Sequence, residues 1–350
     1  MGISGTTLKW FESYLTDRVQ HIQINGKTSS ARKVSYGVPQ GSVLGPILFL
    51  IYIIPLGHLI DQGTTPRHGY ADDNQLYVAL PISLARLRIL NLEDCLVLVQ
   101  DWLTVNKLKG NPTKTELKLF GSQRTLNSLN IQALAVAGLE VSVSPDPVRN
   151  LGVMFDQTLS MGPHVNKVVQ CATFQIRNIG RMRKLLTQEA TKLLVQSTVI
   201  SRLDYCNSLL VGADEKVLDK LQKVQNHAAR VITRTRKGEH ITPVLMTLHW
   251  LPIRERIKFK VMLLVFKARN GLAPPYISEL LPSYDPGRSL RSEDKCLLKL
   301  PRYRLETYGG RSFLVQAAKL WNELSDELRK AKTVAIFKRG LKTHLFRQCF

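Results

Sequence analysis

This 350-residue sequence has few cysteines, and none of them forms a C-x-x-C pair. The five are Cys95, Cys171, Cys206, Cys296 and Cys349. Zinc sites built on cysteine use closely spaced pairs, so we expect no such site here. An odd number of scattered cysteines is typical of free thiols in a reducing compartment. We therefore expect an intracellular protein, in the cytoplasm, the nucleus or both.

Long hydrophobic runs are also missing. The longest apolar stretch covers residues 47–54 and is followed by Pro55 and Gly57. It is shorter than the roughly 20 apolar residues that a membrane-spanning helix needs, and the first residues lack the basic-then-apolar pattern of a secretory signal. We expect no membrane partner, and we interpret the apolar stretch as a buried core helix.

Acidic residues are scarce, with 27 Asp and Glu against 49 Lys and Arg, which gives a formal net charge of +22. Such an excess favours a polyanionic partner, and nucleic acid is the commonest one. The net charge is +2 over residues 1–162, +13 over residues 163–270 and +7 over residues 271–350. This division suggests one module for chemistry and another for holding a polyanion.

The near-neutral first segment contains two adjacent carboxylates, Asp72 and Asp73, within "HGYADDNQLYV". Like charges held side by side are costly unless a cation lies between them, and a divalent metal is the natural cation. Mg²⁺ binds few carboxylates and completes its shell with water and phosphate. The pair lies between two strand-like segments, so we expect it at a hairpin tip. A plain surface turn is the alternative, since Asp is common there.

A second motif, "YGVPQGS" at residues 36–42, precedes the apolar stretch. Gly37, Pro39 and Gly41 should form a rigid turn that a nucleotide can approach closely, and Gln40 offers an amide for hydrogen bonding. We expect Ser42 to cap the helix that follows. Alone, this motif is an ordinary start of a helix.

Hydrophobic periodicity predicts a mixed first part and a helical remainder. A hairpin is expected around Asn25-Gly26, because this dipeptide favours a two-residue turn. Further strands are expected at residues 75–80 and 115–122, with a strand and turn at 148–159. The expected helices cover residues 83–108, 164–184, 187–206, 214–235 and 253–270, with a last pair near 311–330 and 333–347. The fold class that follows is α+β.

The order and spacing of four segments resemble the reverse transcriptase of LINE-type non-LTR retrotransposons, in the jockey-like group. These segments are "GVPQGSVLGPILFLIYI", "YADD", "WLTVNKLKGNPTKTELKLFG" and "LGVMFDQTLSMGPHV". The C-terminal "LQKVQNHAARVITRTRK" is similar to the region that follows the polymerase in these elements. The resemblance implies an RNA-directed DNA polymerase that uses Mg²⁺, an RNA template and a DNA primer. It also implies a partial palm over residues 1–162, a basic helical thumb over 163–270 and a helical tail over 271–350.

The resemblance implies a role for each matching residue. Asp72 and Asp73 would bind the metal, and Lys114 would act near the triphosphate, unless it is an ordinary solvated lysine. The residues that would contact the nucleotide and template are Gly37, Pro39, Gln40, Gly41, Tyr70 and Ala71. Leu151 and Gly152 would belong to the hairpin that grips the primer. The residues that would contact the nucleic-acid backbone are Arg177, Arg181, Arg183 and Lys184.

Two-metal polymerases need a further carboxylate that bridges both ions. Before the Gly37–Gly41 turn the acidic residues are Glu12 and Asp17, which lie on or just after an expected amphipathic helix. Neither matches the strand position that the resemblance requires. We therefore expect an N-terminally truncated fragment with an incomplete second metal site and impaired catalysis. The alternative is a non-catalytic nucleic-acid-binding protein derived from a retrotransposon. The oligomeric state is left open.

Overall fold

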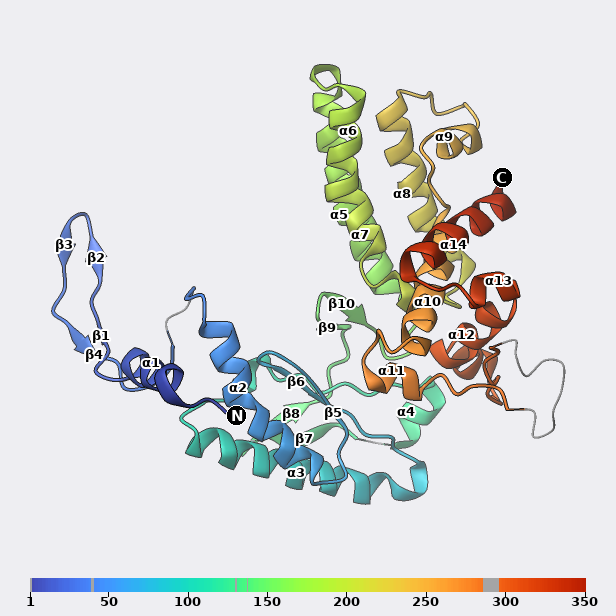
Figure 1. The fold of residues 1–350 in the computed structure, drawn as a ribbon. Helices are drawn as coiled ribbons and strands as arrows, with labels where there is room; N and C mark the ends of the chain where they lie inside the picture. Colours follow the sequence, from blue (N-terminus) through green and yellow to red (C-terminus); the bar gives the residue numbers. More distant parts are fainter. Residues whose placement is uncertain (1, 39–40, 130, 137, 286–295) are drawn as a thin grey trace. The chain divides into compact units, whose positions relative to one another are not determined.

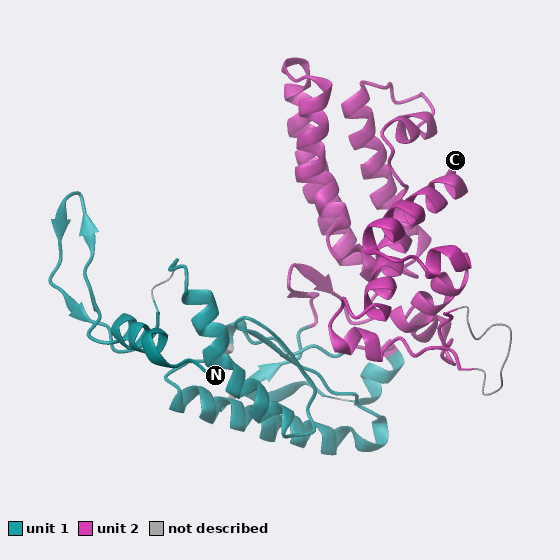
Figure 2. Ribbon diagram, in the orientation of Figure 1, with its two compact units in different colours: residues 1–119, 124–144 teal, residues 120–123, 145–350 magenta. Residues whose placement is uncertain are grey.

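The computed structural model describes residues 2–38, 41–129, 131–136, 138–285 and 296–350. The chain divides into two compact units (Figures 1 and 2). Unit 1 comprises residues 1–119 and 124–144, and unit 2 comprises residues 120–123 and 145–350. Within the described residues, no helix combines the length and the apolar character that a membrane-spanning segment needs.

Unit 1 combines helices with short hairpins. The helices are α1 (Gly5–Leu15), α2 (Gly45–Asp61), α3 (Ala85–Val105) and α4 (Gln123–Leu129), the last of which begins at the unit boundary. The strands are β1 (Val19–Gln20), β2 (Gln23–Ile24), β3 (Lys27–Thr28), β4 (Arg32–Lys33), β5 (Arg67–Tyr70), β6 (Asp73–Leu76), β7 (Ala133–Val136) and β8 (Leu139–Ser142). Each pairs with one antiparallel partner: β1 with β4, β2 with β3, β5 with β6 and β7 with β8.

The predicted hairpin at Asn25-Gly26 is confirmed. Both residues have positive φ, 48° and 77°, between strands β2 and β3. Positive φ at both central residues is what the favoured two-residue turn requires, and Asn and Gly adopt it at the lowest cost. The predicted helix at residues 83–108 is also confirmed, as α3.

The described residues of unit 2 are mainly helical, with a hairpin formed by β9 (Val148–Asn150) and β10 (Val153–Phe155). Its main helices are α5 (Gly162–Met182), α6 (Gln188–Val195), α7 (Ser201–Asp204), α8 (Glu215–Thr233), α9 (Thr242–Thr247) and α10 (Ile253–Arg269). The C-terminal helices are α11 (Pro275–Glu279), α12 (Phe313–Asn322), α13 (Asp326–Arg329) and α14 (Val334–Cys349). The predicted helices after residue 163 are therefore confirmed, and a π-helical turn at Gln196–Ile200 joins α6 to α7.

One continuous core holds unit 2 together. Its fully buried members include Val165 and Ile176 of α5, Ile232 of α8, Phe266 of α10 and Phe337 of α14. The rings of Phe266 and Phe337 stack with centroids 4.2 Å apart. Residues from β10 to the last helix share this core, so burial of apolar surface couples the hairpin and the helices into one body.

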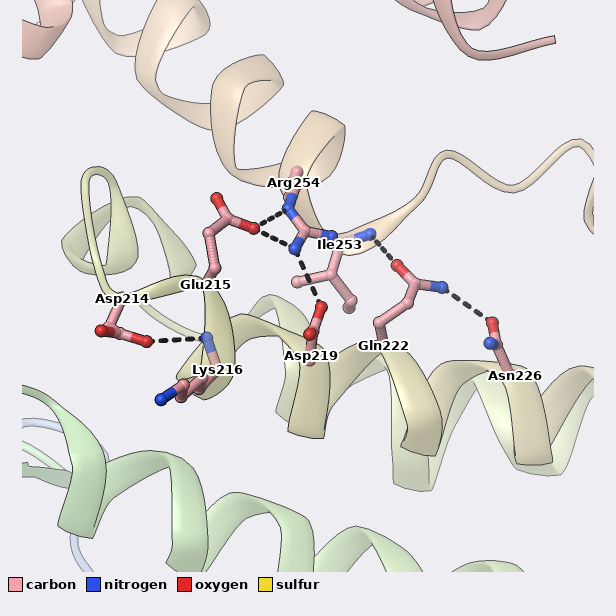
Figure 3. Close-up of polar contacts among 8 residues, drawn as sticks. All are labelled: Asp214, Glu215, Lys216, Asp219, Gln222, Asn226, Ile253 and Arg254. Carbon is pink, nitrogen blue, oxygen red and sulfur yellow. Dashed lines mark hydrogen bonds and ion pairs between the residues drawn. The ribbon is translucent and has the colours of Figure 1, made fainter.

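Polar contacts fix the crossing of α8 and α10 (Figure 3). The Arg254 guanidinium donates to the carboxylates of Glu215 and Asp219, one turn apart on α8. Further along α8, the Gln222 side-chain oxygen accepts the Ile253 backbone N–H at 2.8 Å. A free N–H in the first turn of α10 thereby finds an acceptor on its neighbour.

Three local expectations are wrong, and the strand expected at residues 75–80 ends at Leu76. Residues 115–122 form no strand, and Leu117 makes only an isolated bridge with Val143. Helix α2 is half-buried, not buried: its buried side chains are those of Leu56 and Ile60, while Ile47 and Leu50 are exposed. The apolar run is therefore covered on one face alone.

The third wrong expectation is that Ser42 caps helix α2. Helix α2 begins later, with Leu44 at the N-cap position and Pro46 in its first turn. The Ser42 hydroxyl is buried without a hydrogen-bond partner among the described residues. Pro46 explains the shift, because proline is well suited to the first helical positions, where no N–H partner is needed.

Candidate active site and nucleic-acid interface

The two adjacent carboxylates lie at the tip of the β5–β6 hairpin, as predicted. Tyr70 pairs with Asp73 across the hairpin, so Ala71 and Asp72 form a two-residue turn. Ala71 has a φ of 55°, a conformation that costs a residue with a β-carbon about 1–2 kcal/mol. Such strain is often found at functional sites, where the surrounding structure enforces it.

One face of this hairpin is anchored within unit 1. Arg67 donates to the Gly57 carbonyl at 3.0 Å and makes a two-pronged ion pair with Asp61, at 2.9 and 2.7 Å. The hydrogen bond from Arg67 lowers the pKa of the Asp61 carboxyl. On the same face, Leu76 packs against the small core around Leu56. The hairpin is thereby held against helix α2.

The opposite face of the hairpin is open. The register Tyr70↔Asp73 places these two side chains on the face away from Arg67. Tyr70 is 63% exposed, and Asp72 and Asp73 are exposed as well. No hydrogen bond or ion pair from another described residue reaches either carboxylate. The tip thus presents an aromatic ring and two available carboxylates together.

The two carboxylates at this tip are of a kind that can bind a divalent ion. Carboxylate oxygens are ligands that Mg²⁺ accepts, provided that water or phosphate fills the remaining positions. No group of three or more His, Cys, Asp or Glu residues that could hold a metal occurs within the described part of the chain. Asp72 and Asp73 are exposed carboxylates at this tip.

The glycine turn before α2 is described only at its ends. Gly37 and Gly41 have φ of 78° and 80°, which glycine adopts without strain. The Gly37 carbonyl accepts a hydrogen bond from the Arg18 guanidinium. Pro39 and Gln40 lie outside the described residues.

Lys114 lies in a short helical turn, Pro112–Lys114, that follows α3. Asn111 organises this turn: its side-chain oxygen accepts from the Thr113 backbone N–H at 3.1 Å and from the Thr113 hydroxyl at 2.7 Å. The Lys114 side chain is exposed. Among the described residues, no hydrogen bond or ion pair joins it to the β5–β6 tip.

The residues predicted to grip a primer form the turn of the β9–β10 hairpin, within unit 2. Leu151 and Gly152 have φ of 43° and 85°. The Tyr205 hydroxyl donates to the Leu151 carbonyl at 2.6 Å, and a β-carbon on Gly152 would come within 3.4 Å of the Tyr205 ring. Sequence reasoning missed Tyr205, because this contact joins residues 54 apart.

Asp156 organises the link from this hairpin to α5, and sequence reasoning gave it no role. Its carboxylate accepts from the Ser160 and Met161 backbone N–H groups at 3.0 Å each, and from the Thr158 hydroxyl at 2.7 Å. Burial would raise the pKa of Asp156, but the hydrogen bonds from Thr158, Ser160 and Met161 lower it overall. The run Asp-x-Thr-x-Ser was the signal that could have revealed this, since Asp often accepts from backbone groups just ahead.

The four cationic residues predicted to contact nucleic acid differ in whether their side chains are free to bind it. Arg177, Arg181 and Lys184 are exposed. Arg183 instead donates to the carbonyls of Val231 and Ile232, at 2.8 Å each, and closes the C-terminal end of α8. Its guanidinium is therefore occupied by the protein itself.

Comparison with known proteins gives a family match for the N-terminal part of the chain. Residues 2–155 match the family described as reverse transcriptase (RNA-dependent DNA polymerase), so a reverse transcriptase domain is present. This segment contains the Gly37–Gly41 turn, both carboxylates and the β9–β10 hairpin.

Two similar proteins are named as RNA-directed DNA polymerases of mobile elements, in agreement with the resemblance that the sequence motifs indicated. Over 233 residues the chain is 27% identical to the probable RNA-directed DNA polymerase from transposon BS of Drosophila melanogaster, covering 63% of this chain and 25% of that protein. It is 24% identical over 164 residues to the RNA-directed DNA polymerase from mobile element jockey of the same organism, covering 45% of this chain and 17% of that protein. The chain thus spans about a quarter or less of the relatives' length.

Proposed function

We propose that this chain is part of an RNA-directed DNA polymerase in which Asp72 and Asp73 bind a catalytic Mg²⁺ ion. The observation that carries the proposal is the β5–β6 tip inside the reverse transcriptase domain. There, Tyr70 lies beside two exposed carboxylates that receive no hydrogen bond or ion pair from another described residue. A bound Mg²⁺ would neutralise phosphate charge and help to activate the attacking hydroxyl.

The other predicted residues have roles in the same proposal. Tyr70 and Ala71 would contact the primer end and the incoming nucleotide, and Lys114 would act near its triphosphate. Gly37, Pro39, Gln40 and Gly41 would contact the template and nucleotide. The turn at Leu151 and Gly152 would contact the primer. The partners would be an RNA template and a DNA primer, or their hybrid, in an intracellular setting.

We further propose that the chain by itself is a weak catalyst. Two carboxylates on adjacent residues can hold one ion, but in-line displacement between two ions needs a ligand that bridges them. The described residues offer no cluster of three such ligands. Since ion positioning supplies much of the rate in phosphoryl transfer, an incomplete site should lose most of it.

A second function, nucleic-acid binding without chemistry, is favoured by the charge distribution. The net charge rises from +2 over residues 1–162 to +13 over residues 163–270. Backbone contacts from such a surface would make affinity fall steeply with salt, by about 0.9 in the log–log slope for each phosphate contact on B-form DNA.

The test combines primer extension with metal binding. We expect little extension by the chain with Mg²⁺, and weak Mn²⁺ binding by paramagnetic resonance that Asp72→Asn reduces. Asp101→Asn, which changes another exposed carboxylate of unit 1, is the matched control and should leave Mn²⁺ binding unchanged. Binding that is equal in both variants would contradict the site. Rapid primer extension that Asp72→Asn abolishes would support the metal site at Asp72 and Asp73. It would contradict the proposal that the chain by itself is a weak catalyst.

A further inference from the structure

Helix α5 carries a row of exposed side chains that the assignments above leave largely unused. We call Lys167, Gln170, Phe174, Arg177 and Arg181 the α5 stripe; all five are exposed. They recur at intervals of three or four residues, so they lie on one face of the helix. From Lys167 to Arg181 the stripe is about 21 Å long.

The segment of chain that carries the stripe is basic. No Asp or Glu occurs between Asp156 and Glu189. On α8, the Lys220 ammonium donates to the Asn166 side chain of α5 at 2.8 Å, which places a further cation along the edge of the stripe. The field over this surface therefore favours an anion.

The stripe borders open hollows of the surface, one of which lies near the β9–β10 hairpin. Two hollows, of about 320 and 510 Å³, share the lining residues Lys167 and Gln170. One hollow reaches Met154 of β10, and the other reaches Phe174 and Arg202 of α7. The two hollows thus lie next to each other along α5, one toward the hairpin and the other toward α7.

Phe174 is the unusual member of the stripe. It is 60% exposed, whereas the core side of α5 buries Ala172, Ile176 and Ile179. The apolar face of α5 is therefore packed against the core, and Phe174 lies outside this face. An exposed aromatic ring between cations matches the chemistry of single-strand binding, in which bases stack on aromatic rings and cations follow the phosphates.

We propose that the α5 stripe binds single-stranded nucleic acid, with Phe174 stacking on a base and Lys167, Arg177 and Arg181 contacting phosphates. A duplex keeps its base faces stacked on one another, so only an unpaired strand can use the ring. The proposal rests on the proposed function only in naming nucleic acid as the partner. It requires neither a metal nor catalysis, and RNA and DNA share the chemistry on which it depends.

The test measures fluorescence anisotropy of the whole chain with a short labelled strand, as RNA or as DNA, and with the corresponding blunt duplex, without metal. Phe174→Ala should weaken single-strand binding about tenfold, the scale of one lost stacking contact. Binding of the duplex should change by less than about twofold, and Phe174→Trp should retain single-strand affinity. The RNA and DNA arms show which strand is preferred.

The matched control is Leu193→Ala. Leu193 is 68% exposed on α6, outside the stripe, and its removal should leave all affinities unchanged. Arg177→Gln combined with Arg181→Gln should weaken single-strand and duplex binding alike and lower the single-strand salt slope by about 0.7 for each lost contact. Thermal melting of every variant confirms that the fold is retained.

Three outcomes overturn the proposal: Phe174→Ala behaving like Leu193→Ala, Phe174→Ala weakening the duplex as much as the strand, or Phe174→Trp failing to retain affinity. Absence of primer extension does not bear on it, because binding is measured without chemistry. If the chain does not prefer single strands, the proposed metal site at Asp72 and Asp73 is not contradicted. Absence of binding to any nucleic acid contradicts both proposals.

Discussion

Units 1 and 2 differ most in how they bury apolar surface. In unit 1, the buried cluster consists of Leu56, Ile60 and Cys95, and helices α2 and α3 leave apolar side chains such as Leu50 and Leu98 exposed. In unit 2, buried side chains from β10 to α14 form one core. Since buried apolar area is the main source of stability, unit 2 should be the stable body, while unit 1 carries the candidate metal site on a lightly supported hairpin.

The largest expected effect is a core truncation in unit 2. Phe266→Ala should lower the free energy of unfolding by about 3–5 kcal/mol, because a fully buried ring that stacks on Phe337 is removed. Leu50→Ala on α2, which is 48% exposed, should change it by less than about 0.5 kcal/mol. Urea unfolding followed by circular dichroism measures both. Similar losses from the two substitutions would contradict the difference between the units.

The second prediction compares two aspartates. Asp156→Ala should cost about 1–3 kcal/mol, because the Ser160 and Met161 N–H groups lose their acceptor. Asp72→Ala should have almost no effect on stability, since no described residue contacts its carboxylate. Urea midpoints measure the stabilities, and hydrogen exchange in the first turn of α5 reports the local effect. Equal midpoints for the two variants would show that Asp156 does not secure the start of α5.

The third prediction compares two glycines at the second position of a two-residue turn. Gly26 and Gly152 have φ of 77° and 85°, where alanine costs about 1–2 kcal/mol. Gly152→Ala should lower the melting temperature of unit 2, because its hairpin belongs to the core. Gly26→Ala strains a hairpin whose strands are exposed, so it should only fray that hairpin. Differential scanning calorimetry separates the two, and a larger shift from Gly26→Ala would reverse the comparison.

The smallest expected effect is a pH dependence confined to unit 2. Burial lowers the pKa of His164, and burial together with Arg177 and Arg230 lowers the pKa of His227, both from 6.5. A lowered histidine pKa gives stability that is present above pH 6.5 and is lost as pH falls through the lower folded value. Melting between about pH 7 and pH 5 should show this loss, and His164→Gln should reduce its slope. A melting temperature that rises on acidification would contradict the expected direction of this pH dependence.

Local sequence signals predicted the elements that depend on local chemistry. The Asn25-Gly26 turn, the helices after residue 163 and the hairpin at the adjacent carboxylates each follow from turn residues or from helical periodicity. The helix cap at Ser42 and the strand at residues 115–122 failed, because Pro46 and the absence of a full pairing partner overrode the local preference.

By itself, the sequence determined the reverse transcriptase resemblance, the position of Asp72 and Asp73 at a turn and the concentration of charge after residue 163. Only the tertiary structure decided that Tyr205 supports the turn at Leu151, that Arg183 closes α8 and that Phe174 is exposed beside cations. These facts depend on contacts between residues distant in the chain or on which face of a helix is covered. Periodicity predicts that a helix has a buried face, but the partners that reach its remaining side chains come from elsewhere in the fold.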